Sequence, residues 1–124
     1  MKRRPPMSRD AAMAARPERA DAVHAEERPN GGLLVTVRLP KRRFFRWMST
    51  DGTFERSFGL DPLGREVYEA CDGRTSVRSL VRQFAAEHSV TKPEAEVAVT
   101  TFLKTLVSRG LVNIAVDKAK VSNR

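Results

Sequence analysis

Residues 60–73 read LDPLGREVYEACDG and carry both the start and the stop signals of a helix. Asp61 is a favourable N-cap, and Pro62 suits the first helical position, where an N–H would have no partner in any case. The apolar residues that follow recur at helical spacing as far as Cys71. The stretch therefore predicts a helix that begins after Asp61 and ends before Gly73.

Two more helices are expected downstream of this one. Thr75 or Ser76 caps the second helix, and Thr91 with Glu94 forms the capping-box pattern of the third, which ends at Gly110. Both helices have a continuous apolar face, made in the second by Val77, Leu80, Val81, Phe84 and Ala85, and in the third by Ala95, Val99, Phe102, Leu103 and Leu106.

The residues before the first helix predict strands. Residues 33–39 and 53–58 are rich in β-branched or aromatic residues, and the Asp51-Gly52 dipeptide between them favours a hairpin. A third strand is expected if residues 44–48 are extended, and residues 111–116 suit a short final strand. The sequence thus predicts an α+β fold of winged-helix-like type, with a small antiparallel β-sheet followed by three α-helices.

The chain of 124 residues fits a single domain. Residues 1–32 hold four of the prolines together with many Ala and Arg residues, so a disordered basic tail is predicted there. We expect the folded domain to span residues 33–116 and a polar tail to follow over 117–124.

The composition bears on where in the cell the protein is expected to lie. No stretch approaches the roughly 20 apolar residues that a membrane span needs, and the basic start lacks the apolar region of a signal peptide. Cys71 is the one cysteine, so no internal disulfide can form. A reducing cytoplasm is the expected location. The net charge of +8 raises the question of a nucleic-acid or anionic-surface partner.

Several of these segments together resemble the PqqD family. Residues 60–77 are similar to the family's "LN..G..iW...DG..tv" run, and residues 96–97 and 102–112 to its "DV..FL..L...GLv" ending. Tyr68 stands where the family often has Trp, and Glu96 where it has Asp. The resemblance implies a recognition element that binds the leader of a ribosomally made precursor peptide and presents it to a modifying enzyme, often a radical SAM protein. It also implies that the leader adds as a strand to the sheet edge beside the third helix.

The residues suit strand addition. Residues 53–58 would offer a short edge without proline, and the third helix has a second, semi-apolar arc besides its core face. This arc either binds peptide or simply packs on the sheet. An open edge would also allow two copies to pair as a homodimer. The predicted peptide-binding residues are Thr53, Phe54, Glu55, Arg56, Ser57, Phe58, Val97, Thr101, Lys104 and Thr105.

Two other interpretations concern basic residues. The run from Lys41 to Trp47 interleaves basic and aromatic side chains, which suits partner docking, single-stranded nucleic acid, a membrane face, or a cover for one end of the sheet. A winged-helix DNA-binding transcriptional regulator is the alternative function. The third helix disfavours it, because Glu94 and Glu96 at its start would repel phosphates.

The sequence offers no catalytic site. His24 lies in the predicted tail, His88 lies near the end of the second helix, and Cys71 falls on an apolar helix face. None of them has neighbours at the spacing of a metal site or a nucleophile, and no Gly-rich phosphate loop is present. We therefore expect a binding protein without enzyme activity, cofactor or metal.

Overall fold

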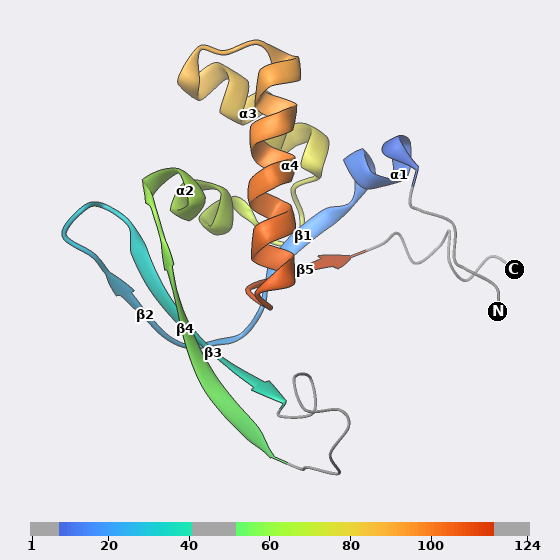
Figure 1. The fold of residues 1–124 in the computed structure, drawn as a ribbon. Coiled ribbons are helices and arrows are strands. Elements are labelled where there is room, and N and C mark those ends of the chain that lie inside the picture. The colour runs from blue at the N-terminus through green and yellow to red at the C-terminus, as the bar shows by residue number, and fades with distance from the viewer. Residues whose placement is uncertain (1–7, 41–51, 116–124) are drawn as a thin grey trace, which may run out of the picture.

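The computed structural model describes residues 8–40 and 52–115, which form an α+β fold with two small antiparallel sheets (Figure 1). The larger sheet has the order β2-β3-β4, where β2 is Ala22–Glu27, β3 is Leu33–Pro40 and β4 is Thr53–Leu60. The smaller sheet pairs β1 (Arg16–Arg19) with β5 (Val112–Ala115). The predicted α+β class with a small antiparallel sheet is confirmed, whereas the winged-helix label stays a prediction.

The three predicted helices are confirmed as α2 (Pro62–Ala70), α3 (Val77–His88) and α4 (Lys92–Ser108). Their caps explain these bounds. The Asp61 carboxylate accepts a hydrogen bond from the Gly64 N–H at 2.7 Å, and Ser76, one of the two predicted caps, accepts from Ser79. Thr91 and Glu94 form the complete capping box.

The core lies between one face of the larger sheet and the helices. Alternate residues of β3 are buried, from Leu33 to Leu39, because side chains of a strand point to opposite faces in turn. Their partners from the helices are apolar residues at helical spacing, among them Leu106, with 1% of its surface exposed. The buried helical residues include Val67, Tyr68, Leu80, Val81, Phe84, Val99, Leu103 and Leu106.

The prediction of a disordered tail over residues 1–32 is wrong for residues 8–32, the part of it that the structure describes. This part contains a short helix, α1 (Arg9–Ala14), followed by β1 and β2. Long-range contacts order it: the Ala15 carbonyl accepts from the Val77 N–H, and the Pro17 carbonyl from the Gly73 N–H, each at 2.9 Å. Sequence patterns could not reveal these contacts, because they join distant parts of the chain.

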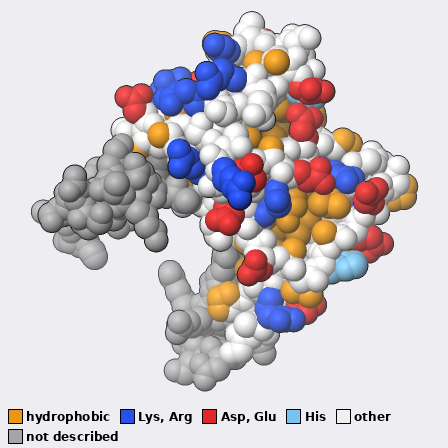
Figure 2. Space-filling view, turned by 180° about the vertical axis from the view of Figure 1, so that it is seen from behind, with side chains coloured by type: hydrophobic (Ala, Val, Ile, Leu, Met, Phe, Trp, Pro, Cys, Tyr) orange, Lys and Arg blue, Asp and Glu red, His pale blue; other side chains and the backbone are white. Residues whose placement is uncertain are grey.

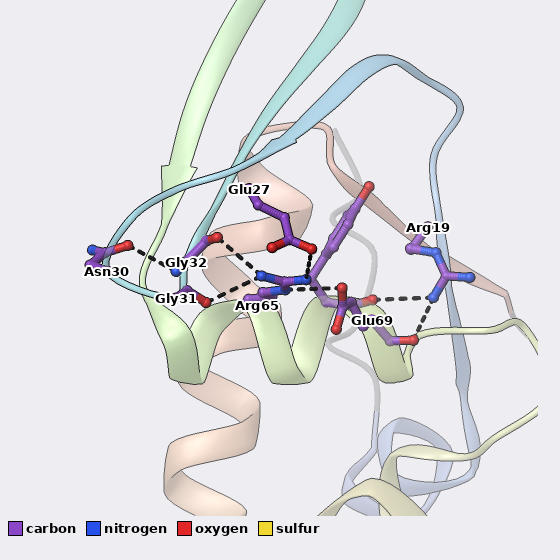
Figure 3. A network of polar contacts seen from close by, with 8 residues as sticks. Arg19, Glu27, Asn30, Gly31, Gly32, Arg65 and Glu69 are labelled. Carbon is purple, nitrogen blue, oxygen red and sulfur yellow. Dashed lines mark hydrogen bonds and ion pairs between the residues drawn. The ribbon is translucent and has the colours of Figure 1, made fainter.

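The third strand of the larger sheet is β2, which the sequence analysis missed. It joins β3 through a turn in which the Asn30 side chain accepts from the Gly32 N–H at 2.8 Å. Arg65 of α2 fastens this turn, since its guanidinium donates to the carbonyls of Gly31 and Gly32 at 3.3 and 3.2 Å (Figure 3). The same group forms ion pairs with Glu27 and Glu69. Acidic and basic side chains also lie close together on the face of the molecule shown in Figure 2.

Three predictions lie outside the described residues. These are the strand over residues 44–48, the role of the basic-aromatic segment from Lys41 to Trp47, and the polar tail over 117–124. The hairpin itself is present, because β3 and β4 pair directly from Leu33 opposite Leu60 to Pro40 opposite Thr53.

Candidate peptide-binding site

Strand β4 is an edge of the larger sheet. It pairs with β3 in a regular register over its whole length, and no described strand lies on its other side. The opposite edge, β2, differs because a register shift between Ala22 and His24 interrupts its pairing. Bulges and exposed charges such as Glu26 are the usual means of blunting a sheet edge. Of the two edges, β4 is therefore the better template for an added strand.

The predicted site residues of β4 divide between the two faces of the sheet. Phe54, Arg56 and Phe58 share the face of the buried β3 residues, toward the helices, and both phenylalanines pack against the core. Glu55 and Ser57 lie on the opposite face together with Thr53. There, Ser57 shares a hydrogen bond of 2.6 Å with the Thr36 hydroxyl, and Glu55 forms an ion pair of 3.1 Å with Arg38.

Phe58 connects β4 to α4. The guanidinium carbon of Arg109, at the C-cap of α4, lies 5.3 Å from the centre of the Phe58 ring, and that of Arg56 lies 5.7 Å from it. Such spacing permits cation–π attraction from both groups. Figure 1 shows the C-terminal end of α4 next to the long β3–β4 hairpin. Arg109 was not among the predicted site residues, although it follows Thr105 by one helical turn, and this spacing could have identified it.

The predicted residues of α4 do not all lie on the side of β4. Thr105 is half-buried and lies on the Arg109 side of the helix, since residues four apart share a face. Val97 is 67% exposed, and Thr101 is also exposed. Lys104 lies elsewhere, because it lines a separate groove together with residues of α1. The structure thus brings Phe58 and Arg56 together with Arg109 at the C-cap of α4, one helical turn after Thr105.

The histidines and the cysteine have structural partners. Nε2 of His88 lies 3.0 Å from both carboxylate oxygens of Glu66, and its ring packs against the Phe84 ring at an angle of 41°. His24 lies 3.6 Å from Glu26 on the exposed strand β2. Over residues 8–40 and 52–115, no three His, Cys, Asp or Glu side chains gather where they could hold a metal ion.

Cys71 is buried, as predicted, and burial raises the pKa of its thiol to about 12. The thiol donates to the Val67 carbonyl at 3.1 Å. A buried neutral thiol of this kind is a poor nucleophile. None of the described helices has the length and apolar character to cross a membrane.

The sequence of the chain was compared with known proteins and with models of protein families. The comparisons with curated proteins and with solved structures gave no match. A family model for coenzyme PQQ synthesis protein D matches residues 39–112, from the end of β3 to the start of β5. The chain therefore belongs to the PqqD family, and this membership supports a non-catalytic, peptide-binding role associated with coenzyme PQQ synthesis.

Proposed function

We propose that this protein binds the leader segment of a ribosomally made precursor peptide in the cytoplasm and presents it to a separate modifying enzyme of the radical SAM class. The observation that carries the proposal is the edge strand β4, which is regular, lacks a described neighbour on its outer side, and contacts α4 through Phe58 and Arg109. Family membership supports the same role.

Binding would take place by strand addition. The backbone N–H and C=O groups along the outer side of β4 would pair with the leader backbone, which provides affinity without reading sequence. Alternate leader side chains would then point toward the helices, where Phe54 and Phe58 offer apolar contact. The Thr105–Arg109 end of α4 would form the other boundary of this surface.

Charge favours an acidic leader. The guanidinium carbons of Arg56 and Arg109 lie 5.7 and 5.3 Å from the centre of the Phe58 ring, so the surface between β4 and the end of α4 has two guanidinium groups next to the same ring. Complementary charge raises the rate of encounter more than it deepens affinity. We therefore expect the association rate to fall steeply with added salt.

The test is a titration of the full chain, labelled with ¹⁵N, with the precursor peptide encoded beside its gene. Strand addition predicts shifts for the amides of Thr53–Phe58 and of Thr105 and Arg109, together with slower hydrogen exchange along β4. Arg74, Arg78 and Arg82 are exposed arginines on α3 or just before it, and they suit contact with phosphates. If the amides of β4 stay unchanged while duplex DNA shifts the amides of these arginines, the DNA-binding regulator is the correct function instead. Doubling of the mass without added peptide, with protection of β4, would show that a second copy occupies the edge.

A pair of charge-reversal variants sharpens this test. Arg56→Glu places a carboxylate beside Phe58, whereas Arg82→Glu makes the same change on an exposed position of α3. We expect Arg56→Glu to weaken binding of an acidic leader roughly tenfold, the effect of about 1.4 kcal/mol. Arg82→Glu should leave it within twofold. Equal effects of the two variants would indicate a general charge effect and contradict recognition at β4.

A further inference from the structure

A concave surface lies against α4, on the face that carries Lys104 and Val107. It is a groove of about 400 Å³, a volume within the range of ligand-binding pockets. The groove is open to solvent, and its lining is almost entirely apolar. Its walls come from α1, the start of α3, α4 and β5, and include Met13, Val77, Leu103, Lys104, Val107 and Ile114.

The wall formed by α1 contacts α4 through an ion pair at the surface. The Arg9 guanidinium donates to both carboxylate oxygens of Glu96, at 2.7 and 3.2 Å, and the buried Met13 side chain anchors the helix. A two-point Arg–carboxylate contact fixes orientation as well as distance. Helix α1 precedes the matched family region, residues 39–112. The groove is thus completed by a segment that lies outside the family match.

Lys104 is the charged group at this groove. Its side chain is exposed, and it forms no ion pair with any residue in the described ranges. The hydroxyls of Thr100 and Ser108 donate instead to carbonyls of their own helix, at 2.7 and 2.9 Å. A complementary ligand therefore presents an apolar group to the groove and a carboxylate to Lys104.

We propose that this groove receives an apolar side chain, flanked by carboxylates, from the surface of the modifying enzyme. The inference rests on the proposed function and names where the enzyme docks. A protein surface suits the open groove better than a small molecule does. Small-molecule pockets bury most of the surface of their ligand, whereas a small ligand in this groove would keep much of its surface in water.

Charge argues against residues 1–7 and 116–124 as occupants of the groove. The sequence before Ser8 contributes Lys2, Arg3 and Arg4, and the sequence after Ala115 contributes Lys118, Lys120 and Arg124, with Asp117 as the acidic residue of both. These segments would bring like charge to Lys104.

Charge and symmetry also disfavour a second copy of the chain. Two copies that met groove to groove would face Lys104 with Lys104. Strand β2 has the right chemistry, with Val23 exposed by 45% next to Glu26 and Glu27. Its insertion into the groove of another copy, however, would join two different surfaces, which builds rings or open filaments of many copies rather than a two-fold dimer. An acidic surface of a different protein would neither bring like charge to Lys104 nor join copies of the chain to one another.

Binding of the leader and of the enzyme on two sides of α4 would explain how the leader is presented to the enzyme. Helix α4 would hold the leader at its Thr105–Arg109 side and the enzyme at its Lys104–Val107 side. Both partners would then be positioned by one continuous helix rather than by two elements that can move apart. The distance between leader and enzyme would be fixed before either binds.

The first experiment uses defined probes on the full chain. The peptide acetyl-Glu-Leu-Phe-Glu-amide should shift the amides of Ala12, Lys104, Val107 and Ile114 and leave Thr53–Phe58 unchanged, whereas acetyl-Lys-Leu-Phe-Lys-amide should bind at least fivefold more weakly. Equal binding of the two peptides would overturn the charge requirement. Tighter binding of octanoate than of the acidic peptide would show a small-molecule pocket, and mass growth with concentration would show self-assembly; both results contradict an enzyme dock.

The second experiment uses a matched pair of variants and the radical SAM enzyme encoded beside the gene. Val107 and Val90 are 37% and 36% exposed, so Val107→Glu and Val90→Glu make the same change at equal exposure, inside and outside the groove. Val107→Glu should weaken enzyme binding at least tenfold, and Val90→Glu less than twofold. Ala12→Glu changes the α1 wall of the same groove and should weaken enzyme binding to a similar extent. A loss in both variants would show that the effect does not come from misfolding of Val107→Glu.

The two proposals can fail separately. If the leader still shifts the amides of β4 but Val107→Glu binds the enzyme normally, the enzyme dock is wrong and leader recognition stands. If the leader leaves β4 unchanged, the proposed function fails whatever the variants show.

Discussion

The guanidinium carbon of Arg109 lies 5.3 Å from the centre of the Phe58 ring, and this contact joins the C-cap of α4 to the C-terminal half of the edge strand β4. The sequence places these two residues in separate elements, with two other helices between them. Their contact defines the surface at which a strand added to β4 would meet the helical layer.

Replacement of Arg109 tests this surface. Arg109→Ala removes the cation at Phe58, and we expect leader affinity to fall about three- to tenfold, as for a partly exposed cation–π and charge contact. Arg78→Ala, at an exposed position of α3, is the matched control and should change affinity by less than twofold. Isothermal titration with the precursor peptide measures both. An unchanged affinity for Arg109→Ala would remove this end of α4 from the site.

Leu106 makes the strongest prediction on stability. Its side chain is 1% exposed in the core, so Leu106→Ala should lower the free energy of unfolding by about 3 kcal/mol, from lost burial and the cavity left behind. Val90→Ala, which truncates a partly exposed side chain, should cost less than about 1 kcal/mol. Urea unfolding followed by circular dichroism gives both values. Similar losses for the two variants would contradict the placement of Leu106 in the core.

The Cys71 thiol predicts a pH dependence of stability. Burial raises its pKa from 9.0 to about 12, so between these values the native state keeps a proton that the unfolded chain releases. This contribution to stability is complete below pH 9 and is lost as the pH rises toward 12. Comparison of urea unfolding at pH 8 and pH 10 should show a smaller loss for Cys71→Ala than for the native chain.

The same burial governs alkylation. At pH 8, iodoacetamide should modify native Cys71 at least roughly a hundredfold more slowly than the chain unfolded in urea, because little thiolate forms at the buried site. Mass spectrometry follows the reaction. Equal rates in the native and unfolded states would show that the thiol is accessible.

The Arg9–Glu96 pair predicts local rather than global effects. Glu96→Gln removes the charge that Arg9 contacts at both oxygens, so the amides of α1 should exchange faster while those of α3 keep their protection. Glu87→Gln on α3 is a suitable control, because Glu87 is exposed and lies at the opposite end of α3 from Val77, whose N–H donates to the Ala15 carbonyl just after α1. Hydrogen exchange read by mass spectrometry after pepsin digestion distinguishes the two. Loss of protection throughout the chain would contradict a purely local attachment.

Local patterns were sufficient for the helices and for the hairpin strands. Asp61, Ser76 and Thr91 each cap the helix that follows, because capping depends on residues only two or three positions apart. Strands β3 and β4 were found from their composition for a similar reason, as was the burial of Cys71 on the apolar face of α2.

The N-terminal segment could not be predicted in this way. Residues 16–19 read RPER, with neither alternation nor β-branched residues, and they form β1 only because β5 supplies a partner. Strand β2 is exposed along its whole length, so it lacks the apolar face that sequence analysis looks for. The groove beside Lys104 depends on α1 and was hidden for the same reason.

The pairing of β1 with β5 has a consequence for how the chain folds. Arg16 lies opposite Ala115, so this small sheet joins the first strand to the last and closes a very long loop. Contacts of such high sequence separation form late and slow the folding reaction. During synthesis, β1 must wait without its partner until β5 has left the ribosome. The hairpin of β3 and β4, which needs only its own segment, can form while the rest of the domain is still being made.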